Sequence, residues 1–130
     1  MSALKVLYVD DEPDIREVAT LSLELDAQIE CRALESGANA LALLADGRWT
    51  PDLILLDVMM PGMDGPTTLA ALREMAGFAT TPVVFMTARA RGFEQERLLQ
   101  LGAIGVIPKP FDPMSLAVQL RALSRSWASV

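Results

Sequence analysis

The order of apolar and periodic segments predicts an α/β protein with one doubly wound, five-stranded parallel sheet and five flanking helices. Short apolar runs alternate with longer stretches in which apolar residues recur at helical spacing. Two runs, 6–9 and 53–56, are apolar at every position, as expected for strands buried on both faces. Because no linker or repeat interrupts the 130 residues, we expect one domain whose sheet is covered by helices on both sides.

The first half of the chain holds three of the expected strands, at 6–9, about 29–33 and 53–56. The helix between the first two follows Pro13, and its inner stripe is expected to be Ile15, Val18, Ala19, Ser22 and Leu25. A second helix opens at Ser36-Gly37, with an expected inner stripe of Ala38, Leu41, Leu44 and Ala45. Pro51 precedes the third strand, which is the strongest strand signal in the chain.

The second half continues the alternation. After the loop at 61–65, Leu69 and Leu72 mark a helix, and the run at 83–86 is a fourth strand. A short helix at about 93–101 ends at Gly102, a residue that commonly terminates helices, and 104–107 is the fifth strand. The last helix spans roughly 113–126, and its buried stripe is expected to be Leu116, Leu120, Leu123 and Trp127.

Composition excludes several classes of function. The net charge of −6 opposes nonspecific binding to nucleic acid. The chain has no histidine, which removes serine–histidine or cysteine–histidine catalysis and most zinc sites, and its single cysteine, Cys31, forms no internal disulfide. The first residues lack a signal-peptide pattern, and no apolar run approaches eighteen residues. We therefore expect a soluble, cytoplasmic protein without nucleic-acid or membrane partners.

Polar residues stand where four of the apolar runs end. They are Asp10-Asp11-Glu12 after the first run, Asp57 after the third, Thr87 after the fourth and Lys109 after the fifth. In a parallel sheet these endings lie along one edge, and open α/β sheets bind ligands in the crevice outside that edge. We expect the acids, the hydroxyl and the ammonium to converge there.

Such a cluster suits phosphoryl chemistry with a divalent cation. Carboxylates of Asp10 or Asp11 beside Asp57 would repel one another unless a cation neutralised them. Mg²⁺ suits a site with few carboxylates, and a main-chain carbonyl near Met59 would add a ligand. A carboxylate can act as the nucleophile that forms an acyl phosphate, with Lys109 and Thr87 contacting the phosphoryl oxygens.

Each of these residues also has a structural interpretation. Asp11 and Glu12 precede Pro13 at a helix start, where acids cap the helix and favour its dipole. Thr87 would cap the turn after its strand, and Lys109 would be an ordinary surface lysine. Asp57 is harder to explain structurally, because an acid that closes a four-residue apolar run has no evident packing role.

The chain resembles the receiver domains of two-component response regulators, in particular the single-domain chemotaxis regulator type. The resemblance runs from about residue 4 to residue 126 of a domain expected to fill 1–130, and it is carried by four segments: Val9-Asp10-Asp11-Glu12, Leu56-Asp57-Val58-Met59-Met60-Pro61-Gly62-Met63-Asp64-Gly65, Met86-Thr87-Ala88 and Pro108-Lys109-Pro110-Phe111. It implies the flavodoxin-like strand order 2-1-3-4-5, which the pattern leaves open among doubly wound orders.

By this resemblance, Asp57 accepts a phosphoryl group from a phosphohistidine on a sensor histidine kinase or phosphotransfer protein. The residues that would hold Mg²⁺ are Asp10, Asp11, Asp57 and, through its main-chain carbonyl, Met59. Thr87 and Lys109 would be the catalytic and switch residues, and the Lys109-Pro110 bond would be cis. The protein would then promote only its own phosphorylation and dephosphorylation, and would not be an enzyme in the usual sense.

The expected output surface comprises the fourth helix, fifth strand and fifth helix, read by a downstream protein. Its switch residues would be Thr87, Ala88, Arg89, Val106 and Lys109. Val106 stands where many family members carry an aromatic residue, and Met59 and Arg89 occupy positions similar to the family's rate-tuning sites. The final helix ends near the last residue, so we expect a free-standing regulator or a receiver cut from a larger protein.

Two other functional classes compete with this hypothesis. A haloacid-dehalogenase-type phosphatase would need a second acid two residues after the nucleophile, where this chain has Met59. A phosphorylation-independent interaction module would not need the acidic pair, Thr87 and Lys109, although Val106 is compatible with it. The response to beryllofluoride or acetyl phosphate with Mg²⁺ separates these possibilities.

Overall fold

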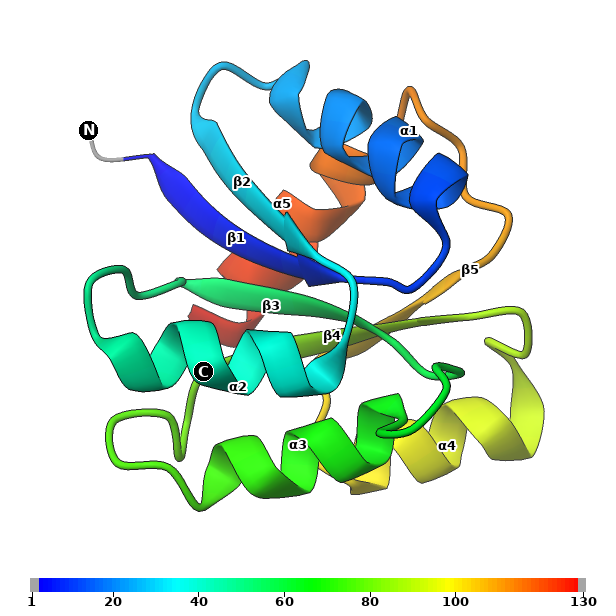
Figure 1. Ribbon diagram of the computed structural model, residues 1–130. Helices are drawn as coiled ribbons and strands as arrows, with labels where there is room; N and C mark the ends of the chain where they lie inside the picture. Colours follow the sequence, from blue (N-terminus) through cyan, green and yellow to red (C-terminus); the bar gives the residue numbers. More distant parts are fainter. Residues whose placement is uncertain (1–2, 129–130) are drawn as a thin grey trace.

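The computed structural model describes residues 3–128 and contains a five-stranded sheet with flanking helices (Figure 1). The strands are β1 (Leu4–Val9), β2 (Ile29–Leu34), β3 (Leu53–Asp57), β4 (Val83–Thr87) and β5 (Gly105–Pro108). The helices are α1 (Pro13–Glu24), α2 (Gly37–Asp46), α3 (Gly65–Arg73), α4 (Gly92–Gln100) and α5 (Leu116–Ala128). Residues 1–2 and 129–130 of the expected domain lie outside the described residues.

All neighbouring strands pair in parallel, in the order β2-β1-β3-β4-β5. The predicted fold class and strand order are therefore confirmed. Parallel strands need long crossover connections, and helices α1 to α4 each supply one, while α5 follows the last strand. The chain thus reverses direction of winding at β1, where β2 lies on one side and β3 on the other, which places the ends of β1 and β3 at a topological switch point.

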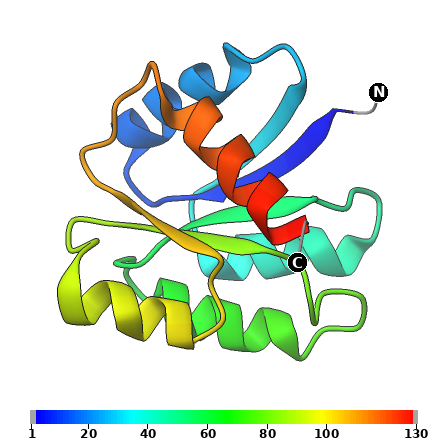
Figure 2. The same ribbon diagram turned by 180° about the vertical axis from the view of Figure 1, so that it is seen from behind.

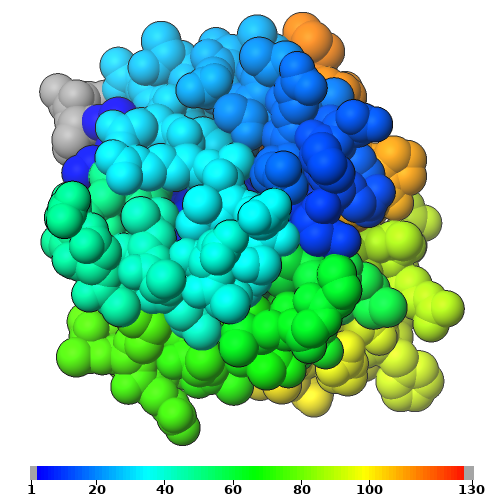
Figure 3. Space-filling model, in the orientation of Figure 1, coloured from blue at the N-terminus to red at the C-terminus, as the bar shows by residue number. Residues whose placement is uncertain are grey.

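Two hydrophobic clusters fill the two sides of the sheet. One joins alternate strand residues such as Tyr8 to α1 and α5, and the other joins the intervening residues such as Leu7 to α2, α3 and α4. Figure 2 shows α5 crossing the sheet on the α1 side. In the space-filling view of Figure 3, the blue and cyan segments that include α1 and α2 occupy much of the visible surface. None of the helices within residues 3–128 is long and apolar enough to cross a bilayer.

Some predicted helix faces were wrong. Val18 and Leu25 of the expected α1 stripe are 44% and 67% exposed, because the sheet contacts the side of the helix that carries Ala19 and Leu23. Helix α1 has more apolar residues than one face accommodates, so periodicity alone does not choose between two adjacent stripes. Ala38 and Ala45 of α2 are likewise exposed, whereas Leu44 is buried as predicted, together with Gly37 and Ala40.

The last helix also departs from its prediction at both ends. It begins at Leu116 rather than near 113, because the Asp112 carboxylate accepts a hydrogen bond from the Met114 amide (3.0 Å) and holds a turn before the helix. Leu116 and Leu120 are fully buried as expected, whereas Trp127 is 43% exposed in the final turn.

Candidate functional site

The polar strand ends meet at the carboxyl edge of the sheet. Asp10 directly follows β1, Asp57 closes β3, Thr87 closes β4 and Lys109 follows β5. The exposed fractions of Asp10, Asp57 and Thr87 are only 0%, 3% and 4%. Polar side chains are rarely buried so deeply without partners, so the contacts of each carry information.

Lys109 lies at the centre of the acidic residues. Its Nζ is 3.0 Å from Asp10 Oδ2, 3.3 Å from Asp57 Oδ1 and 3.4 Å from Glu12 Oε1, and its side chain is 12% exposed. Burial alone would lower the pKa of this ammonium, but the hydrogen bond to Asp10 and the charges of Asp57 and Asp10 raise it overall. Lys109 is therefore a half-buried, charged partner of the acids and not an ordinary surface lysine.

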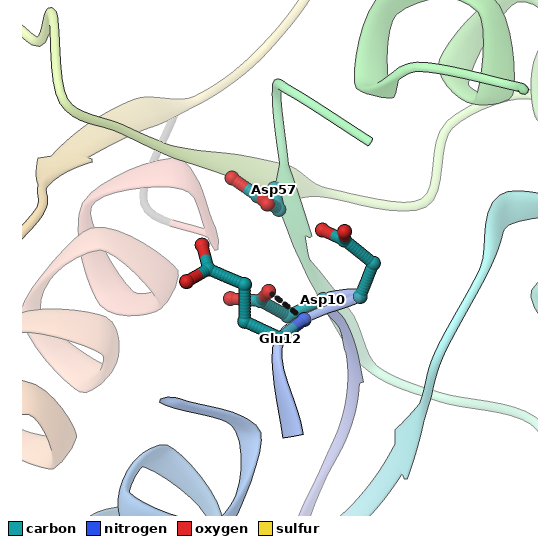
Figure 4. Close-up of side chains that lie close together, drawn as sticks. Asp10, Glu12 and Asp57 are labelled. Atoms are coloured by element: carbon teal, nitrogen blue, oxygen red, sulfur yellow. Dashed lines mark hydrogen bonds between the residues drawn. The ribbon is translucent and has the colours of Figure 1, made fainter. Parts of the chain in front are cut away.

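The carboxylates gather from two loops. Figure 4 shows Asp10 and Glu12, which follow β1, lying near Asp57 at the end of β3. One carboxylate oxygen from each of Asp10, Asp11, Glu12 and Asp57 lies within 4.8 Å of the others. We call these four acids together with Lys109 the acidic pocket. It holds four carboxylates against one ammonium.

The electrostatics of the acidic pocket appear in the pKa of Asp57. The pKa of Asp57 is raised from 3.8 to about 6, chiefly because the carboxyl group is buried and also because of the nearby charge of Asp10, while Lys109 opposes both effects. A group with a strongly shifted pKa among convergent charges marks a candidate functional site. Here the main cause is the loss of solvation on burial, and the neighbouring negative charge of Asp10 adds to it.

These donors fit a hard divalent cation. The ligands on offer are carboxylate oxygens, Asp11 is half-exposed, and a cation would offset the excess charge that raises the pKa of Asp57. Mg²⁺ prefers such oxygen ligands and keeps several waters. The Met59 side chain is 77% exposed beside this edge, and a ligand role for its main-chain carbonyl stays a prediction.

The Asp10 carboxylate has three donors. The Tyr8 hydroxyl donates to Oδ2 at 2.6 Å, the Glu12 amide donates to Oδ1 at 2.9 Å, and Lys109 contacts Oδ2. The Arg16 guanidinium also donates to the Asp10 main-chain carbonyl at 2.8 Å. Tyr8 was not singled out from the sequence, although a hydroxyl two residues before a strand-ending acid shares its face of the strand.

Glu12 does not act as the helix cap that its structural interpretation describes. It occupies the N-cap position of α1, but its side chain makes no capping hydrogen bond there and contacts Lys109 instead. Thr87, in contrast, does what its structural interpretation predicts, since its hydroxyl accepts a hydrogen bond from the Arg89 amide at 3.1 Å. The Thr87 carbonyl accepts one from the Lys109 amide at 2.9 Å, which ties the ends of β4 and β5 together. The Lys109-Pro110 bond is cis, as predicted.

Gly65 holds the far side of the acidic pocket. It opens α3, and its amide donates to the Val58 carbonyl at 2.9 Å. A Cβ at this position would lie 2.5 Å from the Asp57 carbonyl oxygen and 2.9 Å from the Val58 Cα, so only glycine fits. Asp64 caps α3 by accepting from the Thr67 amide at 2.8 Å. The loop of 58–64 is thereby fixed at both ends.

Fold and site together define a doubly wound domain whose buried charged side chains cluster at the carboxyl edge of its parallel sheet. Comparison with known proteins gives the family: residues 6–121 match the response regulator receiver domain. The chain belongs to this family, whose members serve two-component systems. Receiver domains bind Mg²⁺ through an acidic pocket and take part in phosphorylation-dependent signalling with histidine kinases or phosphotransfer proteins.

Individual relatives agree. The chain is 37% identical over 120 residues to the phosphate regulon transcriptional regulatory protein PhoB of Pseudomonas aeruginosa, covering 92% of this chain and 51% of that protein. It is 38% identical over 121 residues to the transcriptional regulatory protein CpxR of Escherichia coli, covering 93% and 49%. The chain thus spans about half the length of these curated relatives.

Solved structures cover the domain more evenly. The chemotaxis response regulator CheY4 of Vibrio cholerae superimposes with a TM-score of 0.82 at 32% identity, covering 95% of this chain and 99% of that one. A response regulator from Chloroflexus aurantiacus gives a TM-score of 0.83 at 28% identity, covering 95% and 99%.

Proposed function

We propose that this chain is a signalling switch in which Asp57 accepts a phosphoryl group from a phosphohistidine on a sensor histidine kinase or phosphotransfer protein. Mg²⁺ would be held by Asp10, Asp11, Asp57 and the Met59 main-chain carbonyl. The observation that carries this proposal is the contact of Lys109 with Asp57 (3.3 Å) among three further carboxylates. A surface ion pair would not need so many acids.

The chemistry follows from the residues. The Asp57 carboxylate forms an oxygen–phosphorus bond while the phosphorus–nitrogen bond of the donor breaks, and the leaving imidazole takes a proton from solvent. When bound, Mg²⁺ neutralises charge on the carboxylates and on the phosphoryl oxygens. Lys109 lies close enough to Asp57 to contact the transferred group. The protein would promote only its own phosphorylation and dephosphorylation.

The switch would act through β4, β5 and α4. Thr87 would exchange its contact with the Arg89 amide for a phosphoryl oxygen, which moves Ala88 and Arg89. Helix α4 buries only Leu98, while Phe93 at its start is 92% exposed. An element with so little burial shifts at low cost in free energy. A hollow of about 520 Å³ between the 88–94 segment and Pro108 gives this movement room.

The output surface in this proposal is α4-β5-α5, read by a downstream protein rather than by nucleic acid or membrane. The net charge of −6 supports the choice of a protein partner, and a cytoplasmic location would bring the chain to a sensor kinase. Val106, half-buried in β5, takes the place of the family's aromatic residue. Val106 also favours a second candidate, a receiver-like module that binds partners without phosphorylation.

Phosphorylation of the purified protein tests the proposal. Acetyl phosphate with Mg²⁺ is expected to add one phosphoryl group, measured by intact mass, and beryllofluoride to change the spectra of α4 residues. Asp57→Asn should abolish both responses, whereas the matched change Asp46→Asn, in an exposed ion pair with Arg48, should preserve them. An unresponsive but folded wild-type protein would support the passive module instead.

A further inference from the structure

Tyr8 is a buried tyrosine whose hydroxyl points at the acidic pocket. It is the only tyrosine in the sequence, and its side chain is fully buried within β1. The hydroxyl lies 2.6 Å from Asp10 Oδ2 and 4.0 Å from the sulfur of Met86. Because a thioether is a weak acceptor, the proton of this hydroxyl belongs to the bond with Asp10.

Asp10 and Asp11 differ in how they are held. Asp10 is fully buried, and donors from three places in the chain fix both of its carboxylate oxygens. Asp11 is half-exposed, and among residues 3–128 its carboxylate makes no hydrogen bond or ion pair. Asp10 is therefore the fixed member of the pair, and Asp11 is free to adapt to a ligand.

The donors of Asp10 Oδ2 also differ from each other. Lys109 is shared among Asp10, Glu12 and Asp57. In the proposed function its ammonium is needed at the phosphoryl group, so it cannot serve Asp10 at every stage. The Tyr8 hydroxyl has no competing strong acceptor and remains with Asp10 throughout.

We propose that Tyr8 is a positioning residue for the divalent cation, acting through its hydrogen bond to Asp10. This inference rests on the proposed function, since it takes the acidic pocket to be the Mg²⁺ site. Without the Tyr8 hydroxyl, the buried Asp10 carboxylate lacks one hydrogen-bond donor and interacts more strongly with Lys109. The ammonium of Lys109 then competes with the cation for this carboxylate. Loss of partners that orient metal ligands weakens metal affinity by about 10- to 100-fold.

A merely structural role for Tyr8 makes a different prediction. A core tyrosine with a satisfied hydroxyl would change stability when the hydroxyl is removed, and the Mg²⁺ affinity of the folded protein would not change. The decisive measurement is therefore the Kd for Mg²⁺, determined by isothermal titration calorimetry without any phosphoryl donor.

Tyr8→Phe keeps the ring and removes only the hydroxyl. We expect its Kd for Mg²⁺ to rise about tenfold or more. The matched control is Met86→Leu, which alters the other neighbour of the hydroxyl and leaves the bond to Asp10; its Kd should stay close to that of the wild type. A Tyr8→Phe protein that binds Mg²⁺ as tightly as the wild type, or a Met86→Leu protein equally impaired, overturns the proposal.

A second measurement needs no variant. Protein labelled with ¹³C at tyrosine Cζ gives a single signal, because the chain has one tyrosine. If Tyr8 is coupled to the cation through Asp10, this signal shifts on Mg²⁺ addition and saturates with the calorimetric Kd. A signal unmoved while calorimetry records binding overturns the role of Tyr8 and leaves the proposed function standing. Absence of Mg²⁺ binding in the wild type overturns both.

Discussion

Two sites in this molecule each place a basic side chain against aspartate, and the pKa of the aspartate shifts in opposite directions at the two sites. The Arg121 guanidinium of α5 donates to both oxygens of Asp26, in the turn that follows α1, and this hydrogen bonding lowers the pKa of Asp26. We call this pair the clasp. In the acidic pocket, Lys109 also contacts a carboxylate, yet the pKa of Asp57 is raised.

The difference lies in charge balance and burial. The clasp pairs the Asp26 carboxylate with the Arg121 guanidinium where both are partly exposed to water, so the charged form of each side chain is favoured. The acidic pocket sets four acids against one base, and two of the acids, Asp10 and Asp57, are buried, so the fold holds like charges close together where water screens them poorly. An ion pair therefore does not by itself indicate a stabilising contact. A cluster with more carboxylates than cationic groups favours the binding of a cation, because the cation offsets the excess negative charge.

Lys109→Ala should break the acidic pocket most severely. Removing one partner of a buried ion pair leaves uncompensated charge and costs about 3 kcal/mol of unfolding free energy. The effect should be largest at alkaline pH without divalent cations and smaller with Mg²⁺, measured by urea denaturation. The other lysine of the chain, Lys5, offers the control, since Lys5→Ala should change little. Equal losses in both variants would contradict the central place of Lys109.

Asp57→Asn should act in the opposite direction. In the folded protein Asp57 keeps its proton up to about pH 6, against 3.8 in the unfolded chain, so its contribution to stability falls as pH rises through that interval. Without Mg²⁺, the unfolding free energy of the variant should exceed that of the wild type by on the order of 2 kcal/mol above this pH interval. The fall in stability with rising pH should also disappear. Urea denaturation at a series of pH values measures the gain and its pH dependence. A variant less stable than the wild type at alkaline pH would contradict the claim that excess negative charge destabilises the acidic pocket.

Mg²⁺ itself should stabilise the folded protein. At a free concentration about ten times its Kd, binding adds about 1.4 kcal/mol to the unfolding free energy. Thermal melting with increasing MgCl₂ measures this gain, with NaCl at matched ionic strength as the control. A cation-induced rise in Tm that sodium reproduces would mean general screening and not a site.

The clasp should give the smallest effect, with the opposite dependence on pH. Asp26 stays ionised in the folded protein at a lower pH than in the unfolded chain, so the clasp stabilises above the unfolded pKa and is lost as pH falls through the folded one. Asp26→Asn should lower the Tm at neutral pH by less than Lys109→Ala does, and the difference should vanish in acid. A difference that persists in acid would show a role beyond charge.

The sequence predicted the fold well because strands buried on both faces leave uninterrupted apolar runs, as at β3 and β4. Ion-pair partners such as Lys109 and Asp57 followed from the ends of these runs, since a parallel sheet brings such ends together. Helix faces were harder: α1 carries two apolar stripes, and only packing decides which is buried. That the Glu12 side chain contacts Lys109 rather than capping α1 also needed coordinates.

The close packing of Gly65 against the backbone of Asp57 restricts where this part of the domain can move. Because there is no room for even a methyl group between the start of α3 and the Asp57 carbonyl, the chain is tightly packed on this side of Asp57. If Asp57 is phosphorylated as proposed, the added group would therefore displace other neighbours, and Thr87 and the sparsely buried α4 are the elements expected to move. One glycine contact would then limit the directions in which phosphorylation can change the structure.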